Sequence, residues 1–189
     1  MARQKSDDKR NAIVAAAIRV IVKQGLSAPT ATIAREAGVA NGSLFTYFQT
    51  KADLFNDLYL ELKTESVDVA LEGLPTKAAL RTQFFHVWMN WMRWAAENPD
   101  KRRALALLAV SDDITPATRD EGHKTMAPLA HLMEQSRAKG TMRDAPLGLV
   151  GALMNSMAEA TMDFVVNDPT HADEHCKTSF NAVWRMLGG

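Results

Sequence analysis

Small, amide and aromatic residues are combined in one short stretch between Ala37 and Lys51, AGVANGSLFTYFQTK. Asn41 and Ser43 carry groups that can form hydrogen bonds with base edges or phosphates. Gly42 lies between them and, because it has no side chain, allows another backbone to come close. Residue types of this kind favour a surface that fits the groove of a duplex.

The second half of the stretch adds hydroxyl groups, a ring and a positive charge. Thr46 and Tyr47 can donate hydrogen bonds to phosphates, and Phe45 can lie against a sugar or a thymine methyl group. Lys51 adds a cation at the expected start of a helix, where free backbone N–H groups also favour anions. A position in the hydrophobic core is the alternative for Phe45 and Tyr47.

Hydrophobic periodicity and turn residues predict three helices around this stretch. The first covers residues 8–24 and ends at Gly25, and a short second helix runs from residue 30 to about 37. After a turn at 38–40, a third helix covers about 41–47. Two short helices joined by a three-residue turn that contains glycine match a helix-turn-helix, whose second helix enters the major groove of DNA.

Helical periodicity continues to the C-terminus and the alternation typical of strands is absent, so the expected fold class is all-α. Thr50 and Asp53 have the spacing of a capping box, which predicts a long helix from Lys51 to about Glu72. Turn residues predict five more helices, near residues 76–97, 99–111, 116–139, 146–167 and 171–187. About nine helices are therefore expected.

Charge is distributed unevenly, although the formal net charge of the 189 residues is zero. Residues 1–51 contain eight Lys and Arg against three Asp and Glu, whereas residues 52–189 contain fourteen against nineteen. A basic module that meets a polyanion, joined to an acidic body, explains this distribution. We therefore predict a DNA-binding domain at 1–51 and a larger helical domain at 52–189.

Composition limits the compartment and the chemistry. Cys176 is the single cysteine, so no internal disulfide can form and a reducing compartment is expected. The charged start, MARQKSDDKR, is unlike a signal peptide, and no segment approaches the ~18–20 apolar residues of a membrane span. We expect a soluble cytoplasmic protein that has no membrane contact. No nucleophile elbow, phosphate-binding glycine loop or zincin motif is present, so neither an enzyme nor a cofactor is expected.

One cluster near the C-terminus, HADEHC, contains possible metal ligands. His171 and His175 are four residues apart on a predicted helix and could bind zinc together with Cys176. A solvated helix start explains the same residues, and no second cluster completes a site. We therefore predict no metal.

The stretch TIAREAGVANGSLFTYFQTKADLF closely resembles the N-terminal signature of the TetR family of bacterial transcriptional regulators. The resemblance covers about residues 8–58. Its residues at family-like spacing are Ile33, Ala34, Ala37, Gly38, Val39, Gly42, Leu44, Tyr47, Phe48, Lys51 and Leu54. In two departures, Pro29 replaces a polar residue that is common before the second helix, and Phe45 replaces a frequent tyrosine, which removes one possible phosphate contact.

The resemblance implies a dimeric repressor whose two basic domains bind successive major grooves of a near-palindromic double-stranded DNA operator. It implies DNA contact by Thr30, Ala31, Asn41, Gly42, Ser43, Phe45, Thr46, Tyr47 and Lys51. It also implies that the body binds a small-molecule effector in a helical pocket and forms a homodimer through its last two long helices. Arg3, Lys5, Lys9 and Arg10 could add contacts to DNA or could form a solvated tail.

Tryptophans and methionines of the body are the candidates for the effector pocket. Trp88, Trp91 and Trp94 recur every three residues and so cover a broad arc of one helix. With methionines, whose thioethers adapt to different shapes, they could line a cavity for a small hydrophobic or aromatic effector. The predicted ligand-binding residues are Trp88, Trp91, Met92, Met126, Met133, Met154 and Met157. Ordinary hydrophobic core is the alternative for each of them.

Two C-terminal stretches are candidates for the dimer interface. Apolar residues lie on several faces of 147–166, as expected for a helix that is covered on more than one side. The last helix has a matching apolar stripe of Phe180, Val183, Trp184 and Leu187. A monomer that uses both helices as its own core is the alternative.

The sequence therefore predicts a ligand-responsive repressor that binds its operator as a dimer and is released by an effector. Two alternatives come from other classes of protein. A sequence-independent architectural protein would bind operator and random duplex equally well. A ligand or metal sensor that does not act through DNA would show no salt-dependent affinity for a duplex.

Overall fold

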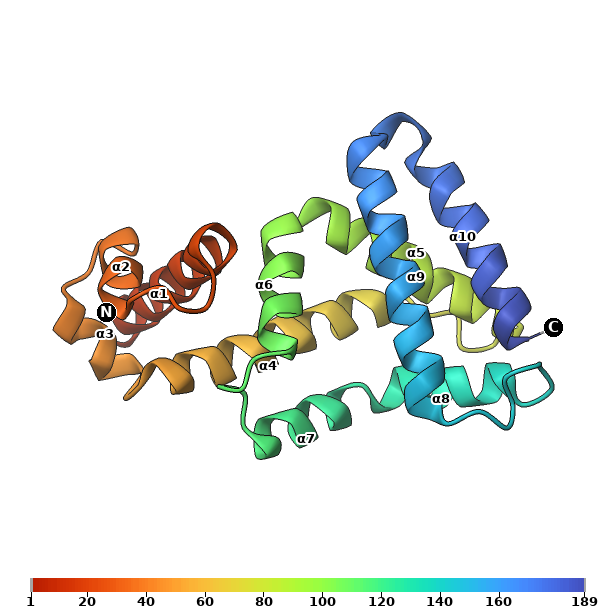
Figure 1. Ribbon diagram of the computed structural model, residues 1–189, viewed down its shortest axis with the longest axis horizontal. Coiled ribbons are helices and arrows are strands. Elements are labelled where there is room, and N and C mark those ends of the chain that lie inside the picture. Colours follow the sequence, from red (N-terminus) through yellow and green to blue (C-terminus); the bar gives the residue numbers. More distant parts are fainter. Residues whose placement is uncertain (1, 189) are drawn as a thin grey trace. The chain divides into compact units, whose positions relative to one another are not determined.

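The computed structural model describes residues 2–188, with side chains from residue 7 onward. Within these limits it contains ten α-helices, one 3-10 helix and no strand (Figure 1), which confirms the predicted all-α class. The α-helices are α1 (Ala2–Gln24), α2 (Thr30–Glu36), α3 (Asn41–Tyr47), α4 (Lys51–Leu71), α5 (Leu80–Glu97), α6 (Pro99–Ala109), α7 (Pro116–Thr125), α8 (Ala127–Arg137), α9 (Leu147–Asn167) and α10 (Ala172–Leu187). The 3-10 helix η1 (Pro169–His171) lies directly before α10.

The helices form two compact units, each with its own hydrophobic core. Unit 1 contains the residues up to Thr64 together with Pro99–His123. Unit 2 contains Glu65–Asn98 and the residues from Lys124 onward, so α4 contributes to both units. The division into 1–51 and 52–189 remains a prediction about function, since the compact units are built from two segments each.

Two of the helices predicted after α4 differ from those observed, and local backbone chemistry explains both differences. The predicted helix at 116–139 is interrupted between α7 and α8. Pro128, in the first turn of α8, lacks an N–H group, and its ring would clash with the carbonyl group four residues earlier in a continuous helix. The predicted helix at 76–97 begins only at Leu80, because the preceding residues form turns whose carbonyl oxygens accept hydrogen bonds from the Gln83 amide.

In unit 1, α1 supplies one side of the core. The helix begins at Ala2 and not near residue 8 as predicted. Its apolar stripe, Ile13, Ala17, Val20 and Ile21, is buried. The same cluster receives Ile33 from α2, Leu44 from α3, Leu54 and Leu58 from α4, and Ala104 and Leu108 from α6. The core of unit 1 therefore extends beyond the three N-terminal helices.

The turn between α2 and α3 is a Schellman motif around Gly38. The N–H of Gly38 donates to the carbonyl oxygen of Arg35 at 3.1 Å, and the N–H of Val39 donates to that of Ala34 at 3.0 Å. Gly38 has a φ of +69°, a conformation in which a residue with a Cβ atom is strained. Glycine at this position therefore sets the direction in which α3 leaves α2.

Helix α4 begins with the predicted capping box. The N–H of Thr50 donates to Asp53 Oδ2 at 2.9 Å, and the N–H of Asp53 donates to Thr50 Oγ1 at 3.0 Å. These bonds satisfy N–H groups that would otherwise lack partners at the helix start. They also fix the backbone around Lys51, the first residue of α4.

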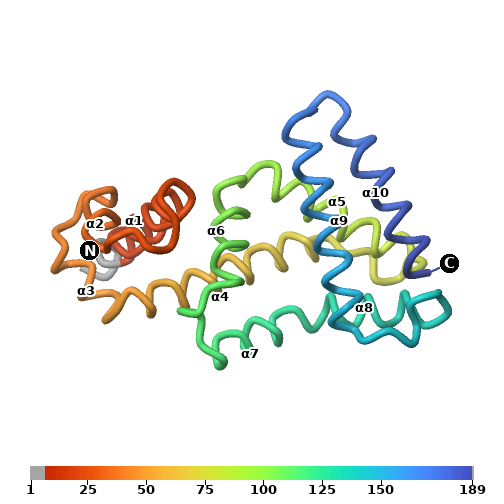
Figure 2. The backbone as a smooth tube through the Cα atoms, viewed as in Figure 1, coloured from red at the N-terminus to blue at the C-terminus, as the bar shows by residue number. Residues whose placement is uncertain are grey.

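In unit 2, α9 and α10 run side by side in opposite directions and pack with α5 and α8 (Figure 2). Phe180, Val183 and Leu187 of α10 are buried in the core of the unit. The ring of Phe180 lies 4.8 Å from that of Phe85, measured between centroids. Three of the four residues of the predicted interface stripe therefore belong to the chain's own core, because a helix that packs on its own core shows the same spacing, and a role of α10 in a dimer stays a prediction.

Helix α9 is long and apolar enough to cross a membrane, judged by length and composition alone. It has 21 residues with a mean hydropathy of 1.2 over its most apolar window, and 28% of that window is buried within the chain. The prediction that no segment approaches a membrane span is therefore wrong for α9. An exposed apolar face that binds another protein chain produces the same composition.

We expect Gly38→Ala to lower the free energy of unfolding by roughly 1–2 kcal/mol, because alanine is strained at positive φ. Gly42→Ala is a matched control, since this glycine lies within α3, its φ is not positive, and open space surrounds the position of an added Cβ. The control should be neutral or up to about 1 kcal/mol more stable than the wild type. Urea unfolding curves measure both, and equal stability of the two variants would contradict the role of the Gly38 turn.

Candidate nucleic-acid interface

Helix α3 presents one side to the core of unit 1 and the other to solvent. Leu44 and Phe48 are fully buried, as the four-residue spacing requires. The residues left exposed on this helix are Asn41, Gly42, Phe45 and Thr46. Phe45 exposes 41% of its surface, so it is not a core residue. The helix therefore offers amide, hydroxyl and aromatic groups to a partner.

The remaining predicted contacts are less exposed. Ser43 and Thr30 are half-buried, whereas Ala31 in the first turn of α2 is exposed. Tyr47 is half-buried and packs against the core cluster of unit 1. The ammonium group of Lys51 lies 5.3 Å from the centroid of the Phe55 ring, a distance at which the ring attracts the cation and limits its movement.

Of the basic residues of α1 that could add contacts to DNA, Arg10 has a role within unit 1, whereas Lys9 is exposed. Arg10 Nη1 lies 3.2 Å from Glu61 Oε2, and Arg10 Nη2 lies 3.5 Å from Asp57 Oδ2. Its guanidinium also lies 5.6 Å from the centroid of the Phe48 ring. Arg10 thus joins α1 to α4 within unit 1. The side chains of Arg3 and Lys5 lie outside the described residues.

Six of the seven predicted ligand-binding residues lie in or against one cluster in unit 2. Trp88, Met92 and Met133 are buried in it, and Trp91, Met154 and Met157 are partly buried against it. Trp88 donates its indole N–H to the carbonyl oxygen of Cys176 at 3.1 Å, which fixes the ring. Met126 precedes α8 at the break after α7 and is not among the residues of this cluster. Unit 2 therefore contains a central cluster of tryptophan and methionine side chains.

A carboxylate beside this cluster was not predicted. Trp94 donates its indole N–H to Glu65 Oε1 at 2.9 Å, and Glu65 is half-buried. Trp94 itself is buried in the same cluster as Trp88. A single acidic residue in an amphipathic helix looks like a solvated position in the sequence, so only the fold reveals that an indole N–H reaches it.

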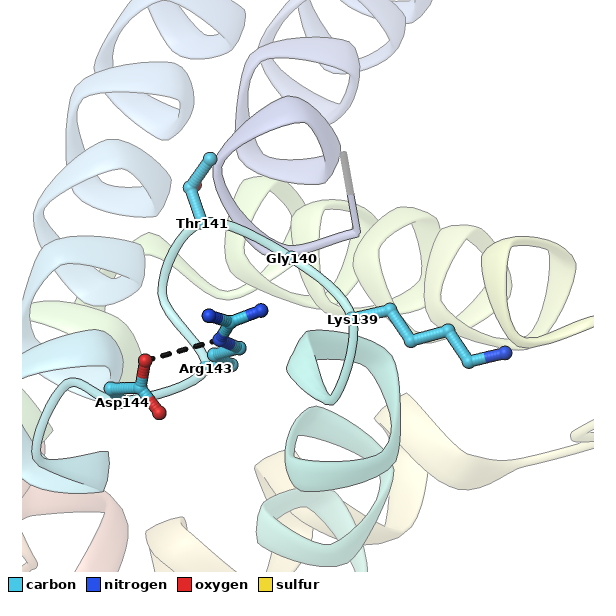
Figure 3. Close-up of a pocket in the computed structure, with 5 residues that line it drawn as sticks. All are labelled: Lys139, Gly140, Thr141, Arg143 and Asp144. Atoms are coloured by element: carbon cyan, nitrogen blue, oxygen red, sulfur yellow. Dashed lines mark hydrogen bonds and ion pairs between the residues drawn. The ribbon is translucent and has the colours of Figure 1, made fainter.

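A separate, open depression lies in the segment between α8 and α9 (Figure 3). It is lined by Lys139, Gly140, Thr141, Arg143 and Asp144. Arg143 and Asp144 form an ion pair of 3.1 Å between Nε and Oδ2. Four of the five lining residues have polar or charged side chains, and none of the five was predicted to bind an effector.

The histidine cluster is organised by Asp168 at the end of α9. His171 Nδ1 and His175 Nε2 each lie 3.0 Å from Asp168 Oδ2. Hydrogen bonds with His175 and His171 hold the pKa of the Asp168 carboxyl below its usual value, and the same carboxylate raises the pKa of His171. Cys176 is buried, which raises the pKa of its thiol and disfavours the reactive thiolate. Among residues 7–188, no group of three His, Cys, Asp or Glu side chains is arranged to hold a metal ion.

We expect Asp168→Asn to lower the pKa of His171 toward its usual value, as measured by an NMR titration. The His171 interaction stabilises the fold below the unfolded-state pKa of about 6.5 and is lost as pH rises through the raised folded-state value. The Asp168 interaction is present above about pH 4 and is lost as pH falls through the lowered value. The loss of thermal stability in this variant should therefore be largest between about pH 4 and pH 6.5. Asp173→Asn removes another carboxylate of the same segment and serves as the control. A loss of thermal stability for Asp168→Asn that is equally large at pH 5 and pH 9 would contradict the role of the His171–Asp168 pair.

Comparison with known proteins places the N-terminal helices in a family. The model for bacterial regulatory proteins of the tetR family matches residues 13–58, which contain most of α1 and all of α2 and α3. Over nearly its full length the chain is also similar to solved structures of transcription regulators. Because TetR family regulators are not enzymes, the comparisons agree with the prediction that this chain is not one.

Three of these structures show the extent of the similarity. A protein from Shewanella sp. PV-4 assigned to the tetR family is 29% identical, with a TM-score of 0.85 over 96% of this chain and 98% of that one. A TetR family transcription regulator from Marinobacter aquaeolei VT8 is 23% identical, with a TM-score of 0.85 over 98% of both chains. The transcriptional regulator FadR from Bacillus subtilis, solved in complex with stearoyl-CoA, is 19% identical, with a TM-score of 0.67 over 94% of this chain and 97% of that one. Residues 13–58 thus form the N-terminal domain of tetR family bacterial regulatory proteins, in a chain whose whole fold is that of TetR family transcription regulators.

Proposed function

We propose that this protein is a cytoplasmic, ligand-responsive repressor that binds a near-palindromic operator as a homodimer. The observation that carries the proposal is the division of α3 into a buried side and an exposed side. Leu44 and Phe48 anchor the helix, while Asn41, Phe45 and Thr46 remain exposed. A short helix that follows a tight turn and exposes amide, hydroxyl and ring groups is suited to reading the major groove.

The contacts divide into two kinds by their chemistry. Asn41 reads a base edge and Phe45 contacts a sugar or a thymine methyl group. Tyr47, Thr46 and Lys51 bind phosphates, and the positive end of the α4 helix dipole favours the same anions. Supporting contacts come from Thr30, Ala31, Gly42 and Ser43. Base contacts then determine which sequence is bound, and phosphate contacts supply most of the salt-dependent affinity.

The exposed side of α9 is the dimer interface in this proposal. Leu149, Leu153 and Phe164 are exposed although they are large and apolar, and Phe164 exposes 64% of its surface. Ala160 lies between Leu153 and Phe164 at helical spacing and is also exposed. A second copy of α9 would cover this stripe, because a two-fold axis brings the same surface of each copy together. The apolar composition of α9 is then explained by protein contact and requires no membrane.

The effector binds in unit 2, at the cluster of tryptophan and methionine side chains. Trp88, Trp91 and Met92 of α5 and Met133, Met154 and Met157 of α8 and α9 supply apolar and adaptable contacts. Met126 lies at the start of α8 and completes the proposed set. FadR was solved with stearoyl-CoA, a ligand with an apolar chain, and a small hydrophobic or aromatic effector fits the residues in this chain.

The effector acts by changing how the dimer presents its two α3 helices. They bind the operator only when their separation matches one turn of DNA, ~34 Å. Because α4 contributes residues to both units, a change at the effector site can reach the DNA-binding helices along it. The coupling is reciprocal, so bound operator weakens effector binding by the factor by which effector weakens operator binding.

A duplex titration tests the proposed function. The protein is titrated at two salt concentrations onto DNA that flanks its own coding region and onto random duplex of equal length. Selective, salt-sensitive binding supports the repressor. Equal binding to every duplex tested favours the architectural alternative, and the absence of salt-dependent binding favours a sensor that does not act through DNA.

Lys51→Ala and Asn41→Ala should have different effects on binding. Lys51→Ala is expected to weaken binding to operator and random duplex alike and to lower the slope of log affinity against log salt by about one, because one phosphate contact is lost. Asn41→Ala is expected to cost about 1–3 kcal/mol on operator and little on random duplex. Equal losses of Asn41→Ala on both duplexes would refute its role in reading a base.

Leu153→Lys should convert the dimer to a monomer, because the interface would bury an unpaired charge. Leu107→Lys on α6 is the matched control, since the two leucines expose 39% and 37% of their surfaces. Sedimentation velocity at micromolar concentration distinguishes the two forms. The dimer proposal fails if the wild type is a monomer or if Leu153→Lys remains a dimer.

A further inference from the structure

The segment that joins α6 to α7, residues 110–115, is bound to α4 by hydrogen bonds from the side chain of Asn56. We name this segment the α6–α7 corner. Asn56 Nδ2 donates to the carbonyl oxygen of Asp113 at 2.8 Å, and Asn56 Oδ1 accepts the N–H of Thr115 at 2.9 Å. The same Nδ2 donates to the carbonyl oxygen of Ala52 at 2.7 Å. One amide group therefore bonds both to the corner and to the first turn of α4.

The α6–α7 corner is also held by hydrogen bonds that do not involve Asn56. Arg119 of α7 donates from Nη1 to the carbonyl oxygen of Ala109 at 2.6 Å and from Nη2 to that of Ser111 at 2.7 Å. Thr115 caps α7, because its Oγ1 accepts the N–H of Thr118 at 3.1 Å. Ile114 is buried in the same core cluster as the DNA-binding helices. The corner can therefore act as a fixed support for α4.

Helix α7 continues the contact along α4. A Cβ atom added at Gly122 would lie 3.0 Å from Tyr59 Cε1 and 3.1 Å from Lys63 Cδ. Glycine at this position leaves room for these two side chains of α4. Tyr59 and Lys63 follow Asn56 by about one and two turns of α4, so the contact extends over the N-terminal part of that helix.

We propose that Asn56 is a positioning residue for operator binding. Its hydrogen bond to Ala52 acts on the turn that contains Lys51, which the proposed function assigns to a phosphate. By joining this turn to the corner, Asn56 limits the movement of the Lys51 backbone relative to the core of unit 1. The inference rests on the proposed function, since Lys51 has a phosphate to bind only if unit 1 binds DNA.

Asn56→Ala and Asn56→Leu test the proposal in the full-length dimer. Alanine removes the hydrogen bonds and the volume, whereas leucine removes the hydrogen bonds and keeps a similar volume. Both should weaken operator binding by up to about tenfold, as expected when one or two hydrogen bonds no longer hold a contact in place. Both should also lower the salt slope by about one, because the Lys51 phosphate contact is no longer held. A smaller folded fraction alone would not change this slope.

The matched control is Asn98→Ala in unit 2. Asn98 donates its side-chain amide to the carbonyl oxygen of Trp94 at 3.0 Å, four residues earlier, which is the same kind of bond as that from Asn56 to Ala52. This variant should keep the wild-type affinity and salt slope. All measurements are made at a temperature at which calorimetry shows that every protein is folded, and amide exchange at Thr115 reports whether the corner has separated from α4.

Gly122→Ala tests the same proposal if the Asn56 variants do not fold. Gly122→Ala adds a methyl group against Tyr59 and Lys63 and should also lower the salt slope, although alanine favours the helix more than glycine does. If wild-type protein binds operator, and the folded variants lose Thr115 protection but keep the wild-type slope, the positioning role is overturned. If wild-type protein shows no salt-dependent binding to any duplex, the proposed function itself fails, and this inference fails with it.

Discussion

Burial of Leu44 and Phe48 in the core of unit 1 decides which side chains of α3 remain available to a partner. Once these two side chains occupy the core, helical geometry leaves Asn41, Phe45 and Thr46 exposed. The glycine turn at Gly38, which has a positive φ, fixes the direction of α3, and the capping box fixes the start of α4. A few buried apolar groups thus orient the polar groups that would read DNA.

The same core shows why the DNA-binding helices are best understood as part of a larger unit. Ala104, Leu108 and Ile114 from residues 99–123 pack in one cluster with the apolar stripe of α1. Asn56 then adds polar bonds between α4 and the α6–α7 corner. Loosening any of these contacts should therefore affect the positions of α3 and Lys51 as well as stability.

Local signals made part of this structure predictable. The spacing of Leu44 and Phe48, the glycine at 38 and the Thr50–Asp53 pair each act within a few residues, so the sequence predicted the helix-turn-helix and the start of α4 correctly. Pro128, which explains the break between α7 and α8, is also a local signal, but the helical periodicity around it concealed the interruption. Tertiary packing decided the remaining features. The stripe of α10 could have faced its own core or a second copy, and nothing local to Asn56 or Glu65 indicates that a distant carbonyl or indole group lies beside it.

The most direct measurement is selection of binding sites from a pool of random duplexes by the purified protein, followed by titration of the recovered sequence at two salt concentrations. We expect an inverted repeat whose half-sites are one helical turn apart, about 10 base pairs, bound by a dimer with strong salt dependence. We also expect a scrambled version of this sequence to bind much more weakly. Failure to enrich any sequence, with equal affinity for scrambled and recovered duplexes, would contradict the claim that α3 reads a specific operator.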